Sequence, residues 1–386
     1  MTALLALSAL AAALVGSGPA SAATDTGSGT EVAAPAARPT AVVALGDSYI
    51  SGEGGRWEGN HARDYGDRRG TDRAAYRGGW FWRYSPNRIY GPTNASGCHR
   101  SDVSPVATSG IAVDALVNLA CSGASTVNLV RSSAGGVGLK GEPSQADQLA
   151  DLAATHDVEL VVVSVGGNDL GFGTIILDCA LDYALSSSWW SQTCNADQQR
   201  NVDARLPEAM AGVGQAIDEI RAVLADAGQG PDSYRLALLS YPSPVPSGDE
   251  FRYRQGSWSR TFTGGCPFWN VDATWARDSF VPMLADSLAA VAADRGVEFL
   301  DLQDALEGRE ICADGARQGD GADAEWARYL STGVLQGEAQ ESLHPNAIGQ
   351  QAIGRCLGLL ASATPGDYRC TNTPGAGPEA MELSGR

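Results

Sequence analysis

The sequence has little positive charge, and this shortage narrows the range of partners. Lys140 is the only lysine, and the 386 residues carry 45 acidic against 27 basic side chains, for a net charge of −18. A chain this acidic is repelled by nucleic acid and by anionic membrane surfaces. We therefore expect neither to be its main partner.

Two further absences argue against a structural zinc site and against a membrane-spanning helix. Cys-x-x-Cys pairs, a common ligand pattern of structural zinc, do not occur. The longest apolar run, residues 4–15, is too short to span a bilayer, and no other run reaches spanning length. No motif demands a metal or an organic cofactor, so we expect none. We also expect a monomer without stable insertion into a membrane.

The N-terminal apolar run has the features of a secretory signal. It is rich in leucine and alanine, and Ala20-Ser21-Ala22 follows it with the small side chains of a cleavage site. The lysine or arginine that normally precedes such a run is missing. A buried N-terminal helix is the alternative, but a stretch rich in Gly, Ser, Thr and Pro follows at once. We expect a signal peptide over residues 1–22 and a secreted, extracellular protein.

The eight cysteines agree with export, because an even count in an oxidising compartment indicates disulfides. Eight cysteines allow roughly a hundred pairings in principle. Short loops give the simplest hypothesis. It pairs Cys98 with Cys121, Cys179 with Cys194, Cys266 with Cys312, and Cys356 with Cys370.

The chain is long enough for one large domain or two small ones. Residues 23–39 contain Ala, Pro, Thr and Gly without periodicity and are expected to form a flexible leader. Residues 371–386 are expected to form a disordered tail. No internal repeat or linker interrupts residues 40–370, so we expect a single domain there.

Apolar strands alternate with amphipathic helices along this domain. The β-branched run Val158–Val165 has the composition of a strand buried on both faces. The expected strands are residues 41–45, 113–120, 158–165, 236–239 and 297–300, and the expected helices are residues 144–154, 205–227, 274–294 and the segment from Pro345. This alternation predicts an α/β fold, a three-layer α/β/α sandwich with a mostly parallel sheet. Sites in such sheets lie at the carboxyl ends of the strands.

Candidate catalytic residues stand at those ends. Gly46-Asp47-Ser48 follows the first strand directly, which places Ser48 at the sheet edge, although Gly-Asp-Ser alone is also a common turn. The Gly-x-Ser-x-Gly nucleophile elbow of the α/β-hydrolases is absent, because Tyr49 and Ile50 follow Ser48. His344 stands at the start of the last helix. The remaining histidines lie in segments typical of surface or packing residues and are His61, His99 and His156.

Two further segments offer hydrogen-bond donors for a developing oxyanion, as acyl transfer requires. Gly123, in Asn118–Ala124, lets a backbone N–H approach without a clashing side chain. Asn168, in Gly166-Gly167-Asn168-Asp169, carries an amide and follows the strand of residues 158–165. Taken singly, each is an ordinary turn residue.

Together these segments resemble the blocks of the SGNH hydrolases, which are GDSL-type lipases and esterases. Gly46-Asp47-Ser48-Tyr49, Asn118–Ala124, Gly166-Gly167-Asn168-Asp169 and His344-Pro345-Asn346 occur in the order of those blocks. The export signal and the cysteines look like those of secreted bacterial members. The resemblance implies hydrolysis of carboxylic esters through an acyl-enzyme.

The resemblance also implies a role for each residue. Ser48 would attack the ester carbonyl, and His344 would take the serine proton and return it to the leaving alcohol. The backbone N–H groups of Ser48 and Gly123 and the side chain of Asn168 would form the oxyanion hole.

The acidic member of the triad has two candidates. The family usually has Asp three residues before the histidine, and this chain has Glu341 there. Glutamate is longer by one methylene group, so Glu341 either orients His344 or swings to solvent. Some relatives instead orient the histidine with a backbone carbonyl two residues before it, here that of Ser342.

Two aromatic segments bear on the substrate. Arg56–Arg100 holds nine arginines against four acids, together with Trp57, Trp80, Phe81, Trp82 and Tyr84. It either rims the site and attracts an anionic headgroup or a sugar ring, or it is a solvated loop with buried aromatics. Trp189-Trp190, inside the expected Cys179–Cys194 loop, suits either acyl-chain contact or core packing.

Three functions follow from these alternatives. We favour a lipid-directed lipase, esterase or phospholipase whose aromatic segments form an acyl groove. A carbohydrate O-acetylesterase on the same scaffold would prefer acetyl esters. The third is a secreted binding protein that has lost catalysis, and the intact Ser48, Gly123, Asn168 and His344 argue against it.

Overall fold

The computed structural model describes residues 37–61, 70–186, 192–331 and 337–386. The expected signal peptide and most of the expected leader lie outside them. Within these residues, a central sheet has seven strands in the order β4-β1-β5-β6-β7-β8-β9, and only β9 is antiparallel to its neighbour. The strands of the sheet are β1 (Thr40–Gly46), β4 (Ala115–Asn118), β5 (Asp157–Ser164), β6 (Arg235–Leu239), β7 (Glu298–Asp301), β8 (Tyr368–Thr371) and β9 (Glu382–Gly385).

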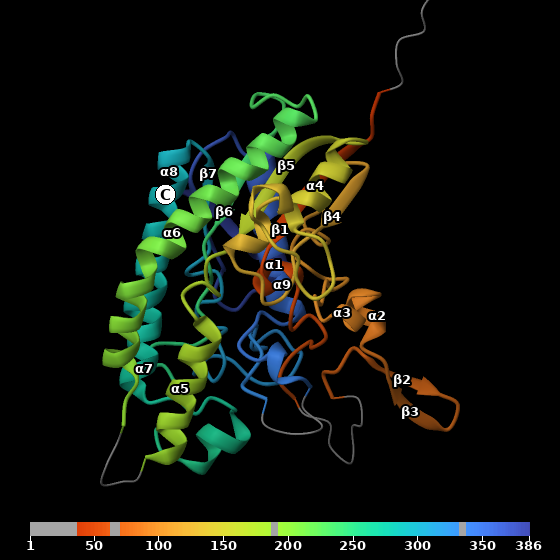
Figure 1. Cartoon of the computed structure of the whole chain (residues 1–386). Coiled ribbons are helices and arrows are strands. Elements are labelled where there is room, and N and C mark those ends of the chain that lie inside the picture. Colours follow the sequence, from red (N-terminus) through yellow and green to blue (C-terminus); the bar gives the residue numbers. More distant parts are fainter. Residues whose placement is uncertain (1–36, 62–69, 187–191, 332–336) are drawn as a thin grey trace, which may run out of the picture. The chain divides into compact units, whose positions relative to one another are not determined.

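Helices flank this sheet and complete an α/β/α arrangement, so the predicted fold class is confirmed (Figure 1). The longer helices are α4 (Gln145–Ala153), α5 (Phe172–Leu185), α6 (Asn195–Asp226), α8 (Val281–Arg295) and α9 (Ala347–Ser362). The shorter ones are α1 (Ser48–Ser51), α2 (Asn87–Tyr90), α3 (Thr93–Ser96), α7 (Asn270–Trp275), η1 (Thr126–Leu129), η2 (Ser132–Ala134), η3 (Ser259–Thr263), η4 (Ala276–Phe280), η5 (Ala339–Glu341) and η6 (Pro378–Ala380). Helices α4, α6 and α8 pack in sequence on one another, and α9 contacts β9 and η6.

The middle of the sheet forms the core. Val42–Leu45 of β1 and Leu160–Val163 of β5 are at most 3% exposed. Parallel strands covered by helices on both faces are apolar throughout, which is why the β-branched run of β5 could be recognised from composition. Each fully buried side chain of this size contributes about 1.5–3 kcal/mol relative to exposure, so these two strands hold the turns that follow them firmly.

The expectation of a disordered C-terminal tail is wrong. Strands β8 and β9 pair with each other at the edge of the sheet. Met381 is 4% exposed, and the guanidinium of Arg386 donates to the carboxylate of Asp301 at 3.1 Å. The order of this segment comes from edge pairing and from a partner far away in the sequence. Its Gly- and Pro-containing sequence shows no period that would reveal either.

Disulfides link loops around the sheet. The four bonds are Cys98–Cys121, Cys179–Cys194, Cys266–Cys312 and Cys356–Cys370, the pairs of the short-loop hypothesis. Each disulfide typically adds about 2–4 kcal/mol, a large share of the net stability of a domain. In the described part of the chain, no helix is both long and apolar enough to cross a bilayer.

Candidate active site

Ser48 lies at the carboxyl end of β1, at the start of α1 (Figure 1). Gly46 takes a φ of +138°, and a Cβ atom there would lie 1.9 Å from the carbonyl oxygen of Ser164 in β5, so the position requires glycine. The N–H of Asp47 donates to the same oxygen at 2.9 Å. Strand β1 stands between β4 and β5, where the order of the parallel strands reverses. Ser48 is therefore at the switch point where α/β sheets bind ligands.

His344 meets Ser48 from the loop before α9. Its Nε2 lies 2.6 Å from Oγ of Ser48, within range of proton transfer. Its Nδ1 lies 2.9 Å from the backbone oxygen of Ser342. Because a carbonyl oxygen only accepts, Nδ1 carries the proton and Nε2 is the acceptor for the serine proton. Burial lowers the pKa of His344, which favours the neutral base.

The loop that carries His344 is strained and held in place. Leu343 takes a φ of +59°, in the left-handed region that a leucine rarely adopts. The hydroxyl of Tyr49 donates to the carbonyl oxygen of Leu343 at 2.9 Å, and the Tyr49 and His344 rings lie 5.1 Å apart. Tyr49 follows Ser48 directly, so the segment of Ser48 itself holds the loop of His344 in place.

The carboxylate of Glu341 binds partners other than His344, so of the two candidates for the acidic member the geometry favours the Ser342 carbonyl. Its carboxylate accepts from Nε1 of Trp57 at 2.9 Å and from the hydroxyl of Tyr90 at 2.8 Å. Glu341 ends the η5 turn, and its carboxylate also accepts from the backbone N–H of Glu338 at 3.0 Å. The carbonyl that contacts the ring is that of Ser342, which is the alternative drawn from the sequence.

The expected oxyanion donors come from two neighbouring turns. Gly123 takes a φ of +87°, a conformation that favours glycine, with open space where a Cβ atom would stand. The side-chain amide of Asn168 donates to the carbonyl oxygen of Ala124 at 2.8 Å, which leaves its second N–H for a substrate. Asn168 and Ser48 line the same pocket.

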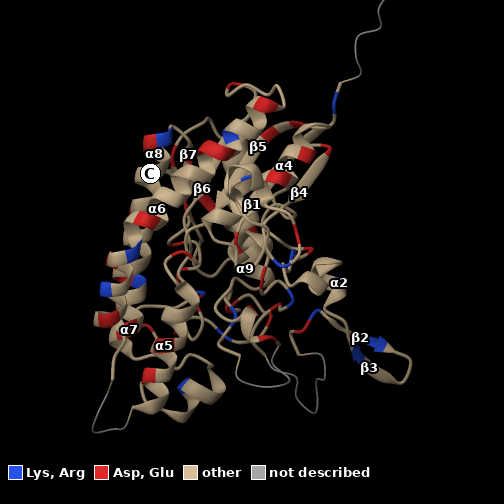
Figure 2. Ribbon diagram, in the orientation of Figure 1, with Lys and Arg blue, Asp and Glu red and all other residues tan. Residues whose placement is uncertain are grey.

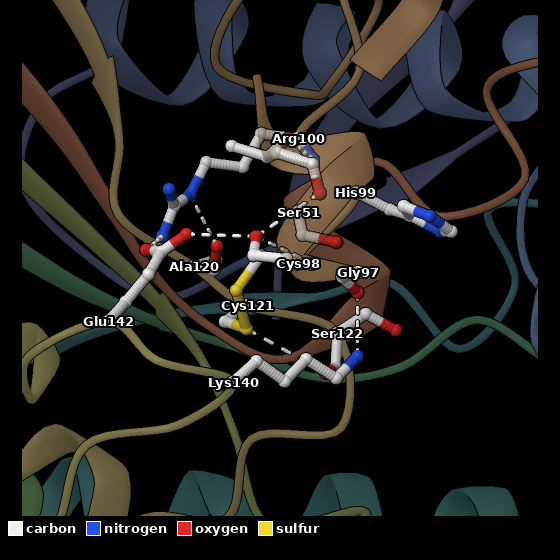
Figure 3. The surroundings of a disulfide bond; sticks show 12 residues. Ser51, Gly97, Cys98, His99, Arg100, Ala120, Cys121, Ser122, Lys140 and Glu142 are labelled. Carbon is white, nitrogen blue, oxygen red and sulfur yellow. Dashed lines mark hydrogen bonds and ion pairs between the residues drawn. A yellow bond between two sulfur atoms is a disulfide. The ribbon is translucent and has the colours of Figure 1, made fainter. Parts of the chain in front are cut away.

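A disulfide fixes the turn that carries Gly123 (Figure 3). The Cys98–Cys121 bond ties this turn to the segment after α3. The side chain of Arg100 donates to the carbonyl oxygen of Ala120 at 2.7 Å, and the N–H of Cys121 donates to the carbonyl oxygen of Gly46 at 3.1 Å. The turn is therefore held beside the end of β1, which Ser48 follows.

Apolar side chains line the pocket beside Ser48. Phe172, Phe280 and Val281 line the pocket that holds Ser48 and Asn168. The same three residues line a neighbouring, almost wholly apolar pocket. Its other apolar lining residues include Ile175, Ile176, Val245, Phe268, Trp275, Ala276 and Leu343. The two pockets therefore adjoin at these shared side chains.

Sequence reasoning missed a buried ion pair beside the site. His99 was expected to be a surface or packing residue. It is buried, at 2% exposed, and its Nδ1 lies 2.9 Å from the carboxylate of Glu53, a partner that the sequence did not indicate. Glu53 stands among glycines five residues after Ser48. Its partner lies 46 positions away, so no local pattern links the two.

The basic, aromatic segment of residues 56–100 has two different parts. Arg56 and Trp57 are buried. Strands β2 (Ala75–Gly78) and β3 (Phe81–Tyr84) form a separate hairpin that carries basic side chains (Figure 2). At its tip, Trp80 is 96% exposed. The other segment singled out for the substrate, Trp189-Trp190, lies outside the described residues.

Asp47 gives a testable dependence of stability on pH. Burial raises the pKa of Asp47 to about 7, although its carboxylate accepts from the N–H of Tyr49 and from the hydroxyl of Tyr241. A raised pKa in the folded state means that the stability contributed by this carboxyl is lost as pH rises through about 7. We expect the melting temperature of Asp47→Asn, relative to that of wild type, to rise between about pH 5 and about pH 8. If calorimetry gave the same difference in melting temperature between variant and wild type at every pH, it would contradict a raised pKa for the buried Asp47 carboxyl.

Comparison with known proteins identifies the class of this protein. A sequence profile of the GDSL-like lipase/acylhydrolase family matches residues 105–352, more than half of the chain. The protein is a carboxylic-ester hydrolase. More particularly, the chain belongs to the GDSL-like lipase/acylhydrolase family. Ser48 precedes the matched residues, so its assignment depends on the geometry described above.

Individual relatives come from Streptomyces. The chain is 27% identical over 329 residues to Lipase 1 of Streptomyces coelicolor, which covers 84% of this chain and 88% of that protein. It is 28% identical over 229 residues to an esterase of Streptomyces scabiei, which covers 56% of this chain. The second alignment spans 62% of that esterase, less than two thirds of its length.

A solved structure shares the fold. Phospholipase A1 from Streptomyces albidoflavus NA297 is similar with a TM-score of 0.50 and 23% identity. The match covers 85% of this chain and all of that one. At this level of identity the likeness concerns the fold, and it agrees with the sheet and helices described here.

Proposed function

We propose that the protein is a secreted lipase or esterase that hydrolyses esters of medium or long acyl chains. Ser48 attacks the ester carbonyl while His344 takes its proton, and the N–H groups of Ser48, Gly123 and Asn168 stabilise the oxyanion. The imidazolium returns the proton to the leaving alcohol, and water then releases the acid from the acyl-enzyme. The observation that carries the proposal is the 2.6 Å approach of Nε2 to Oγ beside an apolar pocket.

Exposed apolar side chains favour a lipid substrate over a sugar. On one face of α5 the exposed residues are Leu177, Leu181 and Leu185. Trp258 and Phe262 are also exposed and stack with ring centroids 3.9 Å apart. This segment is joined to α5, because the N–H of Gly256 donates to the hydroxyl of Tyr183 at 2.8 Å. Exposed apolar patches of this kind suit contact with a lipid aggregate. The names of the relatives, a lipase and an esterase, agree with the proposal.

Export is part of the proposed function. Residues 1–22 have the composition of a signal peptide, and disulfides persist in oxidising compartments. Cleavage after Ala22 would remove this segment and leave the domain from β1 onward intact.

A series of p-nitrophenyl esters from acetate to palmitate tests the substrate class. We expect the highest kcat/KM on medium or long chains. Ala276 lines the apolar pocket, so Ala276→Trp should lower the rate on long chains several-fold and spare acetate. Ala290→Trp, at an exposed position of the neighbouring helix α8, is the matched control and should change neither rate.

The outcomes separate the remaining functions. Activity confined to acetate would contradict the lipid-directed proposal and favour a sugar deacetylase. Absence of activity on every ester, with a folded protein, would favour a binding role. Equal rates of wild type and Ala276→Trp on palmitate would contradict the assignment of the apolar pocket to the acyl chain.

A further inference from the structure

The carboxylate of Glu53 is buried, and its chain segment lies beside His344. Glu53 follows α1, and its backbone N–H donates to the carbonyl oxygen of Ser48 at 3.2 Å. Its side chain has no exposed surface. The next residue, Gly54, packs against the base, since a Cβ atom there would lie 3.3 Å from Cβ of His344. Glu53 thus belongs to the segment that joins the nucleophile to the base.

His99 holds this carboxylate in its charged form. Nδ1 of His99 lies 2.9 and 3.0 Å from the two oxygens of Glu53, and the imidazole stacks on the ring of Tyr90 at 4.3 Å. Burial opposes ionisation, but the hydrogen bond and charge of His99 lower the pKa of Glu53. Burial likewise opposes the charge of His99, but Glu53 raises the pKa of that imidazole. A buried carboxylate stays ionised when it has such a partner.

Gln340 connects the carboxylate to both halves of the site. Its Nε2 lies 2.6 Å from Oε2 of Glu53 and 3.0 Å from Oγ of Ser122. Gln340 lies in η5, two residues before the carbonyl of Ser342 that orients the base. Ser122 directly precedes the oxyanion residue Gly123. Figure 3 shows His99 and Ser122 in the two segments that the Cys98–Cys121 disulfide joins.

We propose that Glu53, held by His99 and Gln340, is the acidic positioning residue of this site and stabilises the imidazolium that forms on His344. The proposal rests on the assignment of Ser48 and His344 as nucleophile and base. In the acylation step the proton of the serine hydroxyl passes to Nε2, and the electron pair stays on Oγ as it attacks the carbonyl. Glu53 exchanges no proton and supplies the negative charge that favours the charged ring.

The charges around the base support Glu53 over Glu341. Burial is the main cause that lowers the pKa of His344, and Glu53 is the charged side chain that opposes this most. Tyr49 also faces the ring, but burial raises its pKa, so it stays neutral. The charged groups that act on His99 are Glu53, Glu338 and Glu341.

Glu53→Gln tests the proposal. We expect kcat to fall about tenfold or more with KM little changed, which corresponds to one pKa unit or more of lost stabilisation. Without the carboxylate the pKa of His344 should fall, so the acid limb of the kcat/KM profile should move to lower pH. Glu142→Gln is the matched control, because Glu142 is a carboxylate of the same region that binds Arg100, and it should leave the limb in place.

Gln340→Ala keeps the test decisive if Glu53→Gln fails to fold. Gln340 is exposed, so its loss should leave the melting temperature unchanged while kcat falls several-fold. Rates of reaction with a fluorophosphonate probe, measured in the same variants, should fall in parallel and need no ester substrate. If Glu53→Gln and Gln340→Ala both kept the rates and pH profiles of wild type, the proposal would be overturned. A shift of the acid limb in Glu341→Gln alone would overturn it as well. Undiminished hydrolysis by Ser48→Ala would instead overturn the assignment of the nucleophile.

Discussion

Replacement of Ser48 by alanine is expected to lower kcat by about a thousandfold or more without changing the fold. In the proposed mechanism the hydroxyl oxygen of Ser48 forms the acyl-enzyme, and oxyanion donors alone provide only residual catalysis. Oγ of Ser48 makes its hydrogen bond to His344, so its removal costs about one such bond. For a domain of this size that shifts the melting temperature by only about 2–4 °C.

The neighbouring serine provides the control for this experiment. Ser51 lies on the same short helix, is buried, and its hydroxyl donates to the carbonyl oxygen of Ser48. Ser51→Ala should therefore test the same helix while keeping the activity. Retained hydrolysis by a folded Ser48→Ala variant, or an equal loss in Ser51→Ala, would show that the nucleophile lies elsewhere.

Asn168→Ala is the second change with a large expected effect. Loss of one oxyanion donor typically costs about a hundredfold to a thousandfold in kcat. Asn168 should reach the upper part of this range, because its amide also binds the carbonyl oxygen of Ala124 and thereby holds the turn of Gly123. KM should change much less, since the oxyanion exists only in the transition state.

Steady-state kinetics on a soluble p-nitrophenyl ester would measure this effect. Asn201→Ala, on helix α6, removes an amide that donates to the side-chain oxygen of Gln198 at 3.4 Å and should have no effect. A loss in KM rather than kcat, or an unchanged rate, would contradict a role of Asn168 in the oxyanion hole.

The parts of the site whose position could be predicted depend on short, local segments of the sequence. Ser48 and Asn168 each follow an apolar strand, and parallel strands bring their carboxyl ends to one edge. The core strands β1 and β5 are recognisable because burial on both faces demands an unbroken apolar run. Periodicity and order along the chain therefore sufficed to predict the core strands and the sheet edge at which Ser48 and Asn168 lie.

The parts that could not be predicted depend on contacts between distant residues. Glu341 stands where the family has its acid, and only the direction of the η5 turn shows that its side chain binds Trp57 and Tyr90. The pairing of Glu53 with His99 crosses 46 positions and follows no period. The C-terminal strand β9 pairs at a sheet edge, where a short polar strand carries little apolar pattern.

The most direct test of the central claim is to locate the covalent intermediate. A fluorophosphonate that reacts with activated serines would be incubated with the protein, and the adduct would be mapped by mass spectrometry of proteolytic peptides. We predict one adduct per chain, on the peptide that contains Ser48, formed slowly in His344→Ala and not at all in Ser48→Ala. An adduct on another residue, or hydrolysis that continues undiminished once Ser48 is fully modified, would contradict the assignment of Ser48 and His344 as the catalytic pair.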